Sequence, residues 1–323
     1  MRTSTEKLIR HKTTRKGVLV PLLEDLFQRP VEIETDEDVA WISALLQSMV
    51  ERGKRRKETP MFSPSQMSEC LRYVYLLKHG KTLGIPKAGL VRVEPNFYFF
   101  NGNFLHLKWQ FALYKLDKYV NDPGIFKLHG CEVPIVSKRK DHGGTVDAVC
   151  SIYSEGYIVD VKGLNVRAFG QIAMGEIPPQ YAMQLTDYAM LANSQRTTAS
   201  RNGASSLTIS NGLLLSENKG GPDPKHLIAL QESVIPVSTH LPEVRRRLGV
   251  LRRHEEGSII PEPECQSTKG IQFLGCPFRK YCRDEVREIE RRRAEAENRD
   301  SAKPTLAVPN RSGRNRTRRN SKR

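Results

Sequence analysis

Residues 144–162 read GTVDAVCSIYSEGYIVDVK, two apolar runs on either side of a turn around Ser154–Gly156. The pattern predicts a β-hairpin with strands over 145–152 and 157–162. Successive side chains of a strand point to opposite faces, so Asp160 and Lys162 share one face. A turn centred on positions 153 and 154 places Asp147 opposite Asp160, and one centred on 154 and 155 places it opposite Lys162. In either register two carboxylates and an ammonium group converge on one face.

These three charged residues allow two interpretations. Two carboxylates beside apolar strand residues repel each other unless a cation neutralises them, and Mg²⁺ or Mn²⁺ prefers such oxygen ligands. Water activated by such an ion next to Lys162 is a nucleophile suited to phosphodiester hydrolysis. The alternative is a plain ion pair among Asp147, Asp160 and Lys162 on the face of a strand.

Residues outside the hairpin add further candidates. His106 lies in a predicted helix and offers either a nitrogen ligand or a structural imidazole. Glu132 precedes the hairpin and offers another carboxylate, although an exposed strand glutamate is the simpler interpretation. Gln184 and Tyr188 are four residues apart in a predicted helix, so they share one helical face.

Composition favours a soluble protein with a polyanionic partner. The chain has 323 residues, a formal charge of +16 and a pI near 9.7, and the last segment, 301–323, carries eight basic and no acidic side chains. The first apolar run, 17–23, is far short of the roughly 20 residues that span a membrane, and is weakly placed for a signal peptide. We therefore expect a cytoplasmic protein with no membrane partner, whose cysteines bind metal or pack in the core.

The rest of the chain predicts a mixed α/β (α+β) fold. Apart from the hairpin, the pattern predicts helices over 36–51, 103–120, 181–192, 243–254 and 283–300, and strands over 131–136 and 207–215. Another helix is predicted to begin at Ser63, with Gln66 completing a capping box, and to end at Gly80. That helix would contain Cys70 near its middle.

The ordered motifs resemble the PD-(D/E)xK nuclease superfamily, and within it the RecB-like exonuclease branch. That branch shows a Gly-x-x-x-His helix, a Gly-x-x-Asp strand, an Asp-x-Lys strand and a Gln-x-x-x-Tyr helix, in this order. The matching residues are Gly102 with His106, Gly144 with Asp147, Asp160 with Lys162, and Gln184 with Tyr188. The resemblance implies a restriction-endonuclease-like fold, in which helices flank a central mixed sheet and the hairpin carries the active site.

The cysteines narrow this resemblance to the CRISPR-associated "Cas-four" iron–sulfur exonucleases and their phage-type relatives. In that family one early and three late cysteines hold a [4Fe–4S] cluster that clasps the ends of the nuclease domain. The matching residues are Cys70, Cys265, Cys276 and Cys282. Cys265 departs from the family pattern because it lies eleven residues before Cys276. Four thiolates also suit a structural Zn²⁺, although the cluster is the favoured expectation.

The resemblance also implies roles for the site residues. The divalent metal, Mg²⁺ or Mn²⁺, would be held by His106, Asp147, Asp160 and the backbone carbonyl of Val161. Lys162 would orient the attacking water. Gln184 and Tyr188 would help to position Lys162 and the DNA strand.

The expected function is a divalent-metal-dependent exodeoxyribonuclease that prefers single-stranded DNA ends, in recombination, repair or replication and alongside other proteins of those processes. The alternative is a non-catalytic DNA-binding adaptor of the same fold in a recombination or CRISPR-adaptation assembly. We expect a polar N-terminal extension (1–60), a RecB-like nuclease domain with the iron–sulfur clasp (61–300) and a disordered basic tail (301–323).

Overall fold

The computed structural model describes residues 17–58, 61–85, 95–199, 207–219, 230–265, 267–269 and 274–301. The helices are α1 (Val20–Leu26), α2 (Asp36–Glu58), the 3₁₀ helix η2 (Pro64–Gln66), α3 (Leu71–His79), α4 (Pro95–Val120), α5 (Val166–Ala173), α6 (Pro179–Ala199), α7 (Val237–Glu256) and α9 (Arg279–Ser301). The strands are β1 (Phe126–Val136), β2 (Gly143–Ile152), β3 (Glu155–Leu164), β4 (Ile209–Asn218) and β5 (Leu230–Pro236). Across these ranges no helix has the length and apolar character that a membrane span requires.

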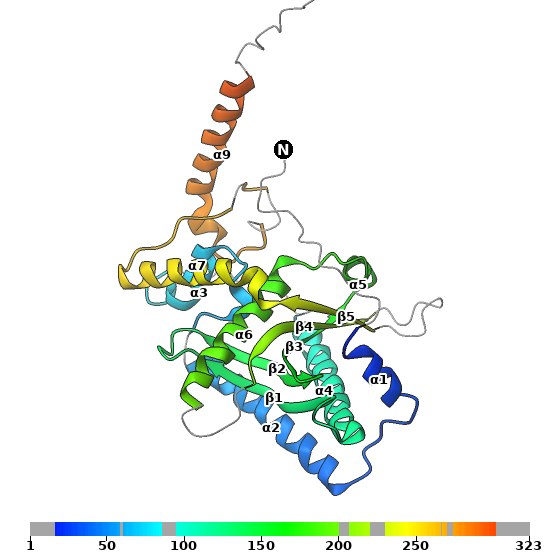
Figure 1. The fold of residues 1–323 in the computed structure, drawn as a ribbon. Coiled ribbons are helices and arrows are strands. Elements are labelled where there is room, and N and C mark those ends of the chain that lie inside the picture. Colours follow the sequence, from blue (N-terminus) through cyan, green and yellow to red (C-terminus); the bar gives the residue numbers. More distant parts are fainter. Residues whose placement is uncertain are drawn as a thin grey trace, which may run out of the picture.

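The five strands form one mixed sheet in the order β1-β2-β3-β4-β5 (Figure 1). β3 and β4 are parallel, and the other neighbouring pairs are antiparallel. A parallel pair needs a long crossover, which α5 and α6 supply. The expected architecture, a central mixed sheet flanked by helices, is confirmed.

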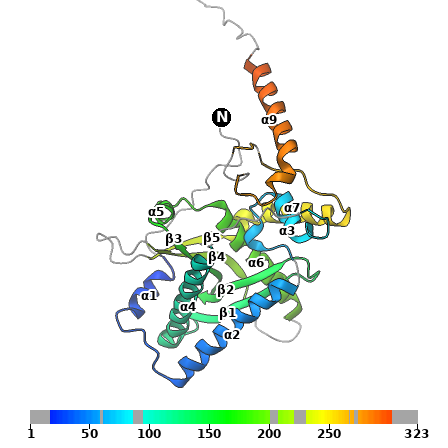
Figure 2. The same cartoon turned by 180° about the vertical axis from the view of Figure 1, so that it is seen from behind.

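Helices cover both faces of the sheet. On one face lie α1 and α4 (Figure 2). Their apolar side chains, Leu23 and Leu113 among them, pack against Val159 and Leu213 of the central strands. On the other face α5 and α6 form a second core with the alternate residues of the same strands, such as Ile158. Because the central strands are buried on both sides, polar residues within them need partners, and this need is greatest for the few that are charged.

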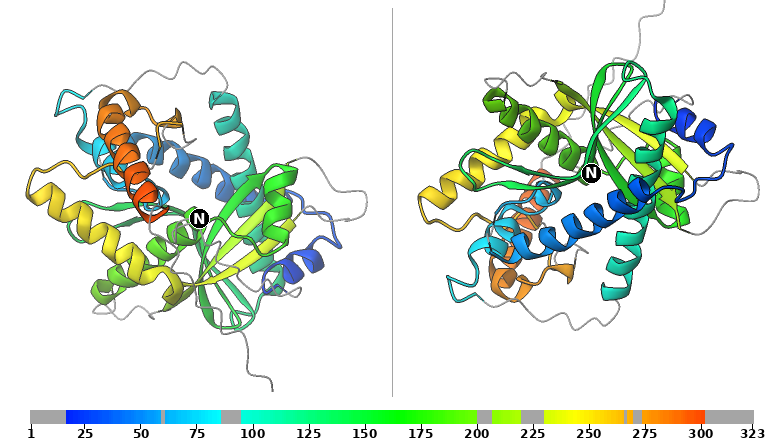
Figure 3. Two further views of the ribbon diagram at one scale, coloured as in Figure 1. Left: turned by 90° about the horizontal axis from the view of Figure 1, so that it is seen from above. Right: turned by 90° about the horizontal axis from the view of Figure 1, so that it is seen from below.

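A third apolar cluster joins the early and late parts of the chain. α3 and α7 pack together with Phe278, which lies just before α9. Seen from above, these elements gather on one side of the sheet (Figure 3), whereas α9 extends away from the body as a long charged helix (Figure 1). Segments about 200 residues apart in sequence are thereby brought side by side.

The helices and strands expected from the sequence all form, most of them longer than predicted, but the helix expected from Ser63 is interrupted. The short η2 begins after Ser63, whose side chain makes no capping hydrogen bond. A break follows, and α3 starts only at Leu71 with Cys70 as its N-cap residue. The prediction that Cys70 lies in mid-helix is therefore wrong: its backbone is extended out of the helical region, so the thiol stands at a helix terminus.

α1 is a folded part of the body that the sequence pattern does not predict. The carboxylate of Glu232 in β5 accepts hydrogen bonds from the backbone N–H groups of Val18, Leu19 and Val20, the last two at 2.8 and 2.6 Å. Leu19 is fully buried in the core beneath α4. Glu232 thus satisfies the first N–H groups of this segment and fixes α1 to the edge strand.

Replacing this carboxylate with an amide tests the attachment. We expect Glu232→Gln to lower the free energy of unfolding by about 1–3 kcal/mol, because the amide presents only one acceptor oxygen to three backbone donors that are buried or partly buried. Urea unfolding measures the loss. The exposed Glu256→Gln is the control for charge and should change stability by under ~1 kcal/mol. Equal stability of both variants would show that Glu232 does not hold α1.

Candidate functional site

The β2–β3 hairpin adopts one of the two predicted registers. Ala148 pairs with Val159 and Ile152 with Glu155, as expected for a turn centred on Tyr153 and Ser154, both of which have positive φ. This register sets Asp147 opposite Asp160. The ladder pairing ends at Ala148, and beyond it Asp147 Oδ2 accepts the Val161 N–H at 2.8 Å. The side chain of Asp147 thus takes the place of a strand carbonyl.

Asp147 and Asp160 are the centre of the site. Both are almost fully buried, at 6% and 4% exposure. Asp147 Oδ1 lies 3.0 Å from His106 Nδ1 on α4. Asp160 accepts hydrogen bonds from Lys162 Nζ at 2.8 Å and from Gln184 Nε2 on α6 at 3.0 Å. Two helices from opposite faces of the sheet therefore meet the hairpin at these carboxylates.

Tyr188 contacts the site from behind the hairpin. A Cβ atom at Gly144 would lie 2.8 Å from the Tyr188 hydroxyl oxygen, so the strand can approach the ring only because residue 144 is glycine. Tyr188 is buried in the α6 core with Ala189 and Leu185. It therefore supports the strand that carries Asp147, while Gln184, one turn earlier, holds Asp160.

Burial and mutual proximity together set the protonation of these groups. Burial raises the pKa of Asp160, Lys162 opposes this and Asp147 adds to it, with a net increase. Burial also acts to raise the pKa of Asp147, but the hydrogen bond and charge of His106 outweigh it and the pKa is lowered. Burial acts to lower the pKa of Lys162, but the two carboxylates reverse this and raise it. Lys162 is therefore held as an ammonium group beside the carboxylates.

Residue chemistry at this point of the sheet fits a divalent cation. Carboxylate oxygens with one imidazole nitrogen are a donor set for Mg²⁺ or Mn²⁺. Carboxylates this deeply buried require a compensating positive charge. The structure brings together six of the residues that the sequence motifs single out, namely His106, Asp147, Asp160, Val161, Lys162 and Gln184.

Glu132 is the residue for which the sequence pattern misleads. The pattern favours an exposed strand glutamate, but the residue is only 2% exposed. One of its carboxylate oxygens lies within 4.8 Å of a potential metal-ligand atom of His106 and of Asp147. Gln110, which no motif indicates, donates to Glu132 at 3.1 Å and to the Asp147 backbone carbonyl at 2.8 Å. The sequence signal that could identify Gln110 is its spacing, since a residue four positions after His106 lies on the same face of the helix.

The four predicted cysteine ligands gather at a second location, next to the third apolar cluster. A hydrogen bond from Cys265 is the main cause that lowers the pKa of the Cys70 thiol to about 6. The hydrogen bond with Cys70 and burial raise the pKa of Cys265, and Cys276 and Cys282 are near enough to raise it further. Arg72 of α3 donates a hydrogen bond to Cys282 in the first turn of α9. Cys131 and Cys150 lie on strands in the sheet core, as predicted.

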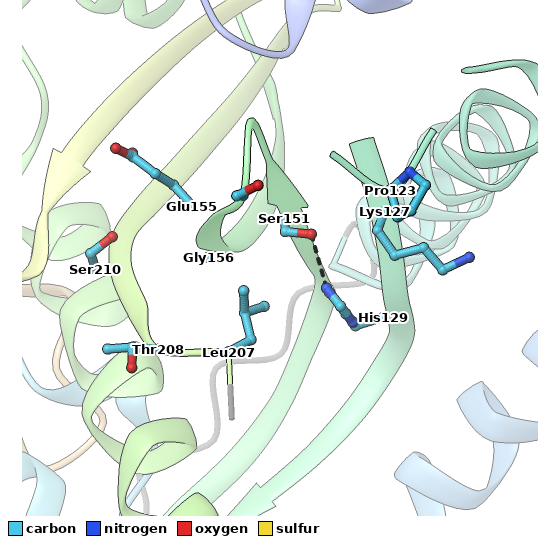
Figure 4. A pocket seen from close by; sticks show the side chains of 10 residues that line it. Pro123, Lys127, His129, Ser151, Glu155, Gly156, Leu207, Thr208 and Ser210 are labelled. Carbon is cyan, nitrogen blue, oxygen red and sulfur yellow. Dashed lines mark hydrogen bonds between the residues drawn. The ribbon is translucent and has the colours of Figure 1, made fainter. Parts of the chain in front are cut away.

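The pocket in Figure 4 is separate from the carboxylate site. It is an open depression of about 600 Å³ at the turn end of the hairpin, lined by polar residues that include Lys127, His129, Ser151 and Glu155. His129 on β1 and Ser151 on β2 are hydrogen bonded at 3.1 Å. At ~3.3 Å per strand residue, the turn at Tyr153 and Ser154 lies roughly 20 Å from Asp147. The pocket contains none of the predicted site residues.

Comparison with known proteins gives only distant likenesses. No protein-family model and no curated protein sequence matches the chain. Among solved structures it is similar to SSO0001, with 14% identity and a TM-score of 0.36 over 82% of this chain and 96% of that one. It is also similar to an alkaline exonuclease, LHK-Exo, from Laribacter hongkongensis, with 11% identity and a TM-score of 0.36 over 65% of this chain and 94% of that one. The complex of LHK-Exo with dAMP gives 11% identity and a TM-score of 0.38 over 61% and 90% of the two chains.

Proposed function

We propose that this protein is a divalent-metal-dependent exodeoxyribonuclease that acts on single-stranded DNA ends. In this proposal it works in the cytoplasm and takes part in DNA recombination, repair or replication. The observation that carries the proposal is the meeting of Asp147, Asp160 and Lys162 where the hairpin strands separate. Two buried carboxylates next to a polyanion's binding surface are unfavourable for a module that only binds DNA, since they repel phosphates. They favour a protein that needs a cation at this point.

In this proposal His106, Asp147, Asp160 and the backbone carbonyl of Val161 hold the Mg²⁺ or Mn²⁺ ion. Such an ion, when bound, polarises a phosphoryl oxygen and lowers the pKa of water. The protein contributes the rest of the chemistry. Lys162, kept protonated by its carboxylate neighbours, offers N–H donors and a fixed positive charge to the phosphodiester as charge builds up on it.

The α6 residues maintain this geometry. Gln184 donates to Asp160 Oδ1, the same oxygen that Lys162 contacts, and so fixes the carboxylate in one orientation. The Tyr181 ring lies 5.7 Å from Lys162 Nζ and limits the positions open to its ammonium group. The proposed roles of Gln184 and Tyr188 are therefore to position Lys162 and the strands that carry the ligands.

Degradation of end-labelled single-stranded DNA tests the function. Wild type and Lys162→Ala are compared with Mn²⁺, with Mg²⁺ and with a chelator, and 5′ and 3′ labels are followed separately. We expect metal-dependent shortening from an end by wild type alone, with faster loss of single-stranded than of duplex DNA. Equal binding of DNA by both proteins without cleavage would support a non-catalytic adaptor instead. Matched RNA oligonucleotides test the preference for DNA.

The proposed clasp is a [4Fe–4S] cluster on Cys70, Cys265, Cys276 and Cys282. The proposal is supported by the proximity of these thiols, which come from three segments of the chain: Cys70, Cys265, and Cys276 with Cys282. Cys70 lies at a helix terminus, and Arg72 lies beside Cys282. In this proposal the clasp joins the two ends of a nuclease domain spanning 61–300, with 1–60 as an extension.

The basic tail 301–323, which apart from its first residue lies outside the described residues, is proposed to add non-specific affinity. We expect its deletion to weaken binding to single-stranded DNA and to reduce the slope of log K against log salt by about 0.7 for each phosphate that the tail neutralises. Binding is measured by fluorescence anisotropy over a range of NaCl concentrations. Single-turnover cleavage at saturating protein should not change. An unchanged salt slope would show that the tail does not touch DNA.

A further inference from the structure

Glu132 occupies an unusual position in β1. It lies between the pairs Cys131–Ala148 and Val133–Val146, and therefore opposite Asp147 on β2. On the other side of Asp147, the hairpin register places Asp160. Three acidic residues thus follow one another across β1, β2 and β3, with Asp147 in the middle. Each of them is at most 6% exposed.

The backbone of Glu132 is held in a conformation that glutamate rarely adopts. Its φ is +50°, in the left-handed region, inside a strand whose neighbours continue the ladder on both sides. An L-residue in this region costs of order 1 kcal/mol and persists where the surrounding structure over-determines it. Such outliers are concentrated at active sites and ligand-binding positions.

A helix residue holds the Glu132 carboxylate. Gln110 is fully buried, and its Nε2 donates both to Glu132 Oε1 and to the backbone carbonyl of Asp147. The Oε1 atom of the same amide is buried without a hydrogen-bond partner among the described residues. Gln110 lies one turn after His106 on α4, so both side chains face β1 and β2 together.

His106, Glu132 and Asp147 form a donor set of their own. One ligand atom from each lies within 4.8 Å of the others, and no other group of this kind occurs among the described residues. The two carboxylate oxygens of Asp147 point in different directions, Oδ1 toward His106 and Oδ2 toward Val161, so that each can contact a different cation. One imidazole and two carboxylates suit Mn²⁺ and Mg²⁺.

We propose that Glu132 is an additional ligand that gives this protein a second divalent-cation site, formed with His106 and Asp147. With both cations bound, His106 belongs to the second site, Asp147 is shared between the two, and the first cation keeps Asp160 and the backbone carbonyl of Val161. Gln110 is then a positioning residue for Glu132. This inference rests on the proposed nuclease function and deepens it. A second cation beside the first would supply additional positive charge to the phosphate oxygens of a bound strand.

Titration with Mn²⁺, followed by electron paramagnetic resonance and calorimetry, tests the second site. We expect wild type to bind two Mn²⁺ per chain in this site. Glu132→Gln keeps the shape of the side chain, and it should lower the Mn²⁺ affinity of the second site at least about tenfold while the affinity of the first site stays unchanged. Asp160→Asn should instead lower the Mn²⁺ affinity of the first site, on the Asp160 side. The exposed Glu155→Gln at the hairpin turn is the matched control and should bind as wild type does.

The outcomes separate this inference from the nuclease proposal. Wild type that cleaves DNA with one bound Mn²⁺ overturns the second site and leaves the nuclease function intact. Two bound Mn²⁺ without any cleavage supports the site and overturns the nuclease function. Unchanged Mn²⁺ binding by folded Glu132→Gln, or by Glu132→Asp if the first variant does not fold, removes Glu132 from the ligands.

Discussion

Asp160→Asn is expected to reduce the cleavage rate at least ~1000-fold, which corresponds to about 4 kcal/mol of transition-state stabilisation. The amide keeps the volume of the carboxylate and one acceptor oxygen, which Gln184 contacts in the native protein. It removes the negative charge that attracts the cation and that keeps Lys162 protonated. Cleavage of a 5′-labelled single strand under single-turnover conditions measures the effect.

Folding of the Asp160→Asn variant should be preserved. Burial raises the pKa of Asp160 in the native protein, because the charged form is disfavoured there. A neutral isostere at this position is thus tolerated by the fold, and circular dichroism and thermal unfolding should match wild type or exceed it. Asp117→Asn, which changes an acidic residue outside the site, serves as the control. A wild-type cleavage rate in Asp160→Asn would remove Asp160 from the mechanism.

If the proposed [4Fe–4S] cluster is present, Cys70→Ser is expected to abolish it and to lower the melting temperature by roughly 10 °C, given ~2–4 °C per kcal/mol for a domain of this size. Serine offers a hard hydroxyl oxygen, which is a much weaker ligand than a thiolate for the iron of such a cluster. The loss should fall on the contacts between α3, α7 and the start of α9. Iron and acid-labile sulfide content, the visible absorption of the protein and its thermal unfolding together measure the change.

A cysteine outside the proposed ligands provides the control for this variant. Cys131→Ala changes a strand residue in the sheet core and should keep full iron and sulfide content. Protein that contains stoichiometric zinc and no iron would overturn the cluster, while leaving a structural metal at the same cysteines. Full stability and colour in Cys70→Ser would exclude Cys70 as a ligand.

Much of the fold follows from local pattern. The helices now seen as α2, α4, α6 and α7, and the strands of the hairpin, each carry an apolar periodicity that identifies them from a single sequence. The pattern does not predict α1, α5 or β5. α1 has only seven residues, and its formation depends on Glu232, more than 200 positions away. A short helix whose first N–H groups are satisfied by a distant strand leaves no local signal of comparable strength.

The candidate site divides in the same way. The side chains that share a face, Asp160 with Lys162 and Gln184 with Tyr188, are neighbours by the geometry of a strand and of a helix, so spacing alone places them together. Sequence pattern misjudges Glu132 because its exposure depends on α4 lying over β1, and because its positive φ turns the side chain away from the simple alternation of a strand.

The sequence by itself determined most of the helices and strands, that two carboxylates and a lysine would meet on one hairpin, and which cysteines are available as ligands. Only the tertiary structure decided the hairpin register, the burial of Glu132 and the position of Cys70 at a helix terminus. Local periodicity acts over a few residues, within one strand or one turn of a helix. Register, burial and the assembly of distant ligands depend on which surfaces pack together, and that is set by contacts between segments far apart in the chain.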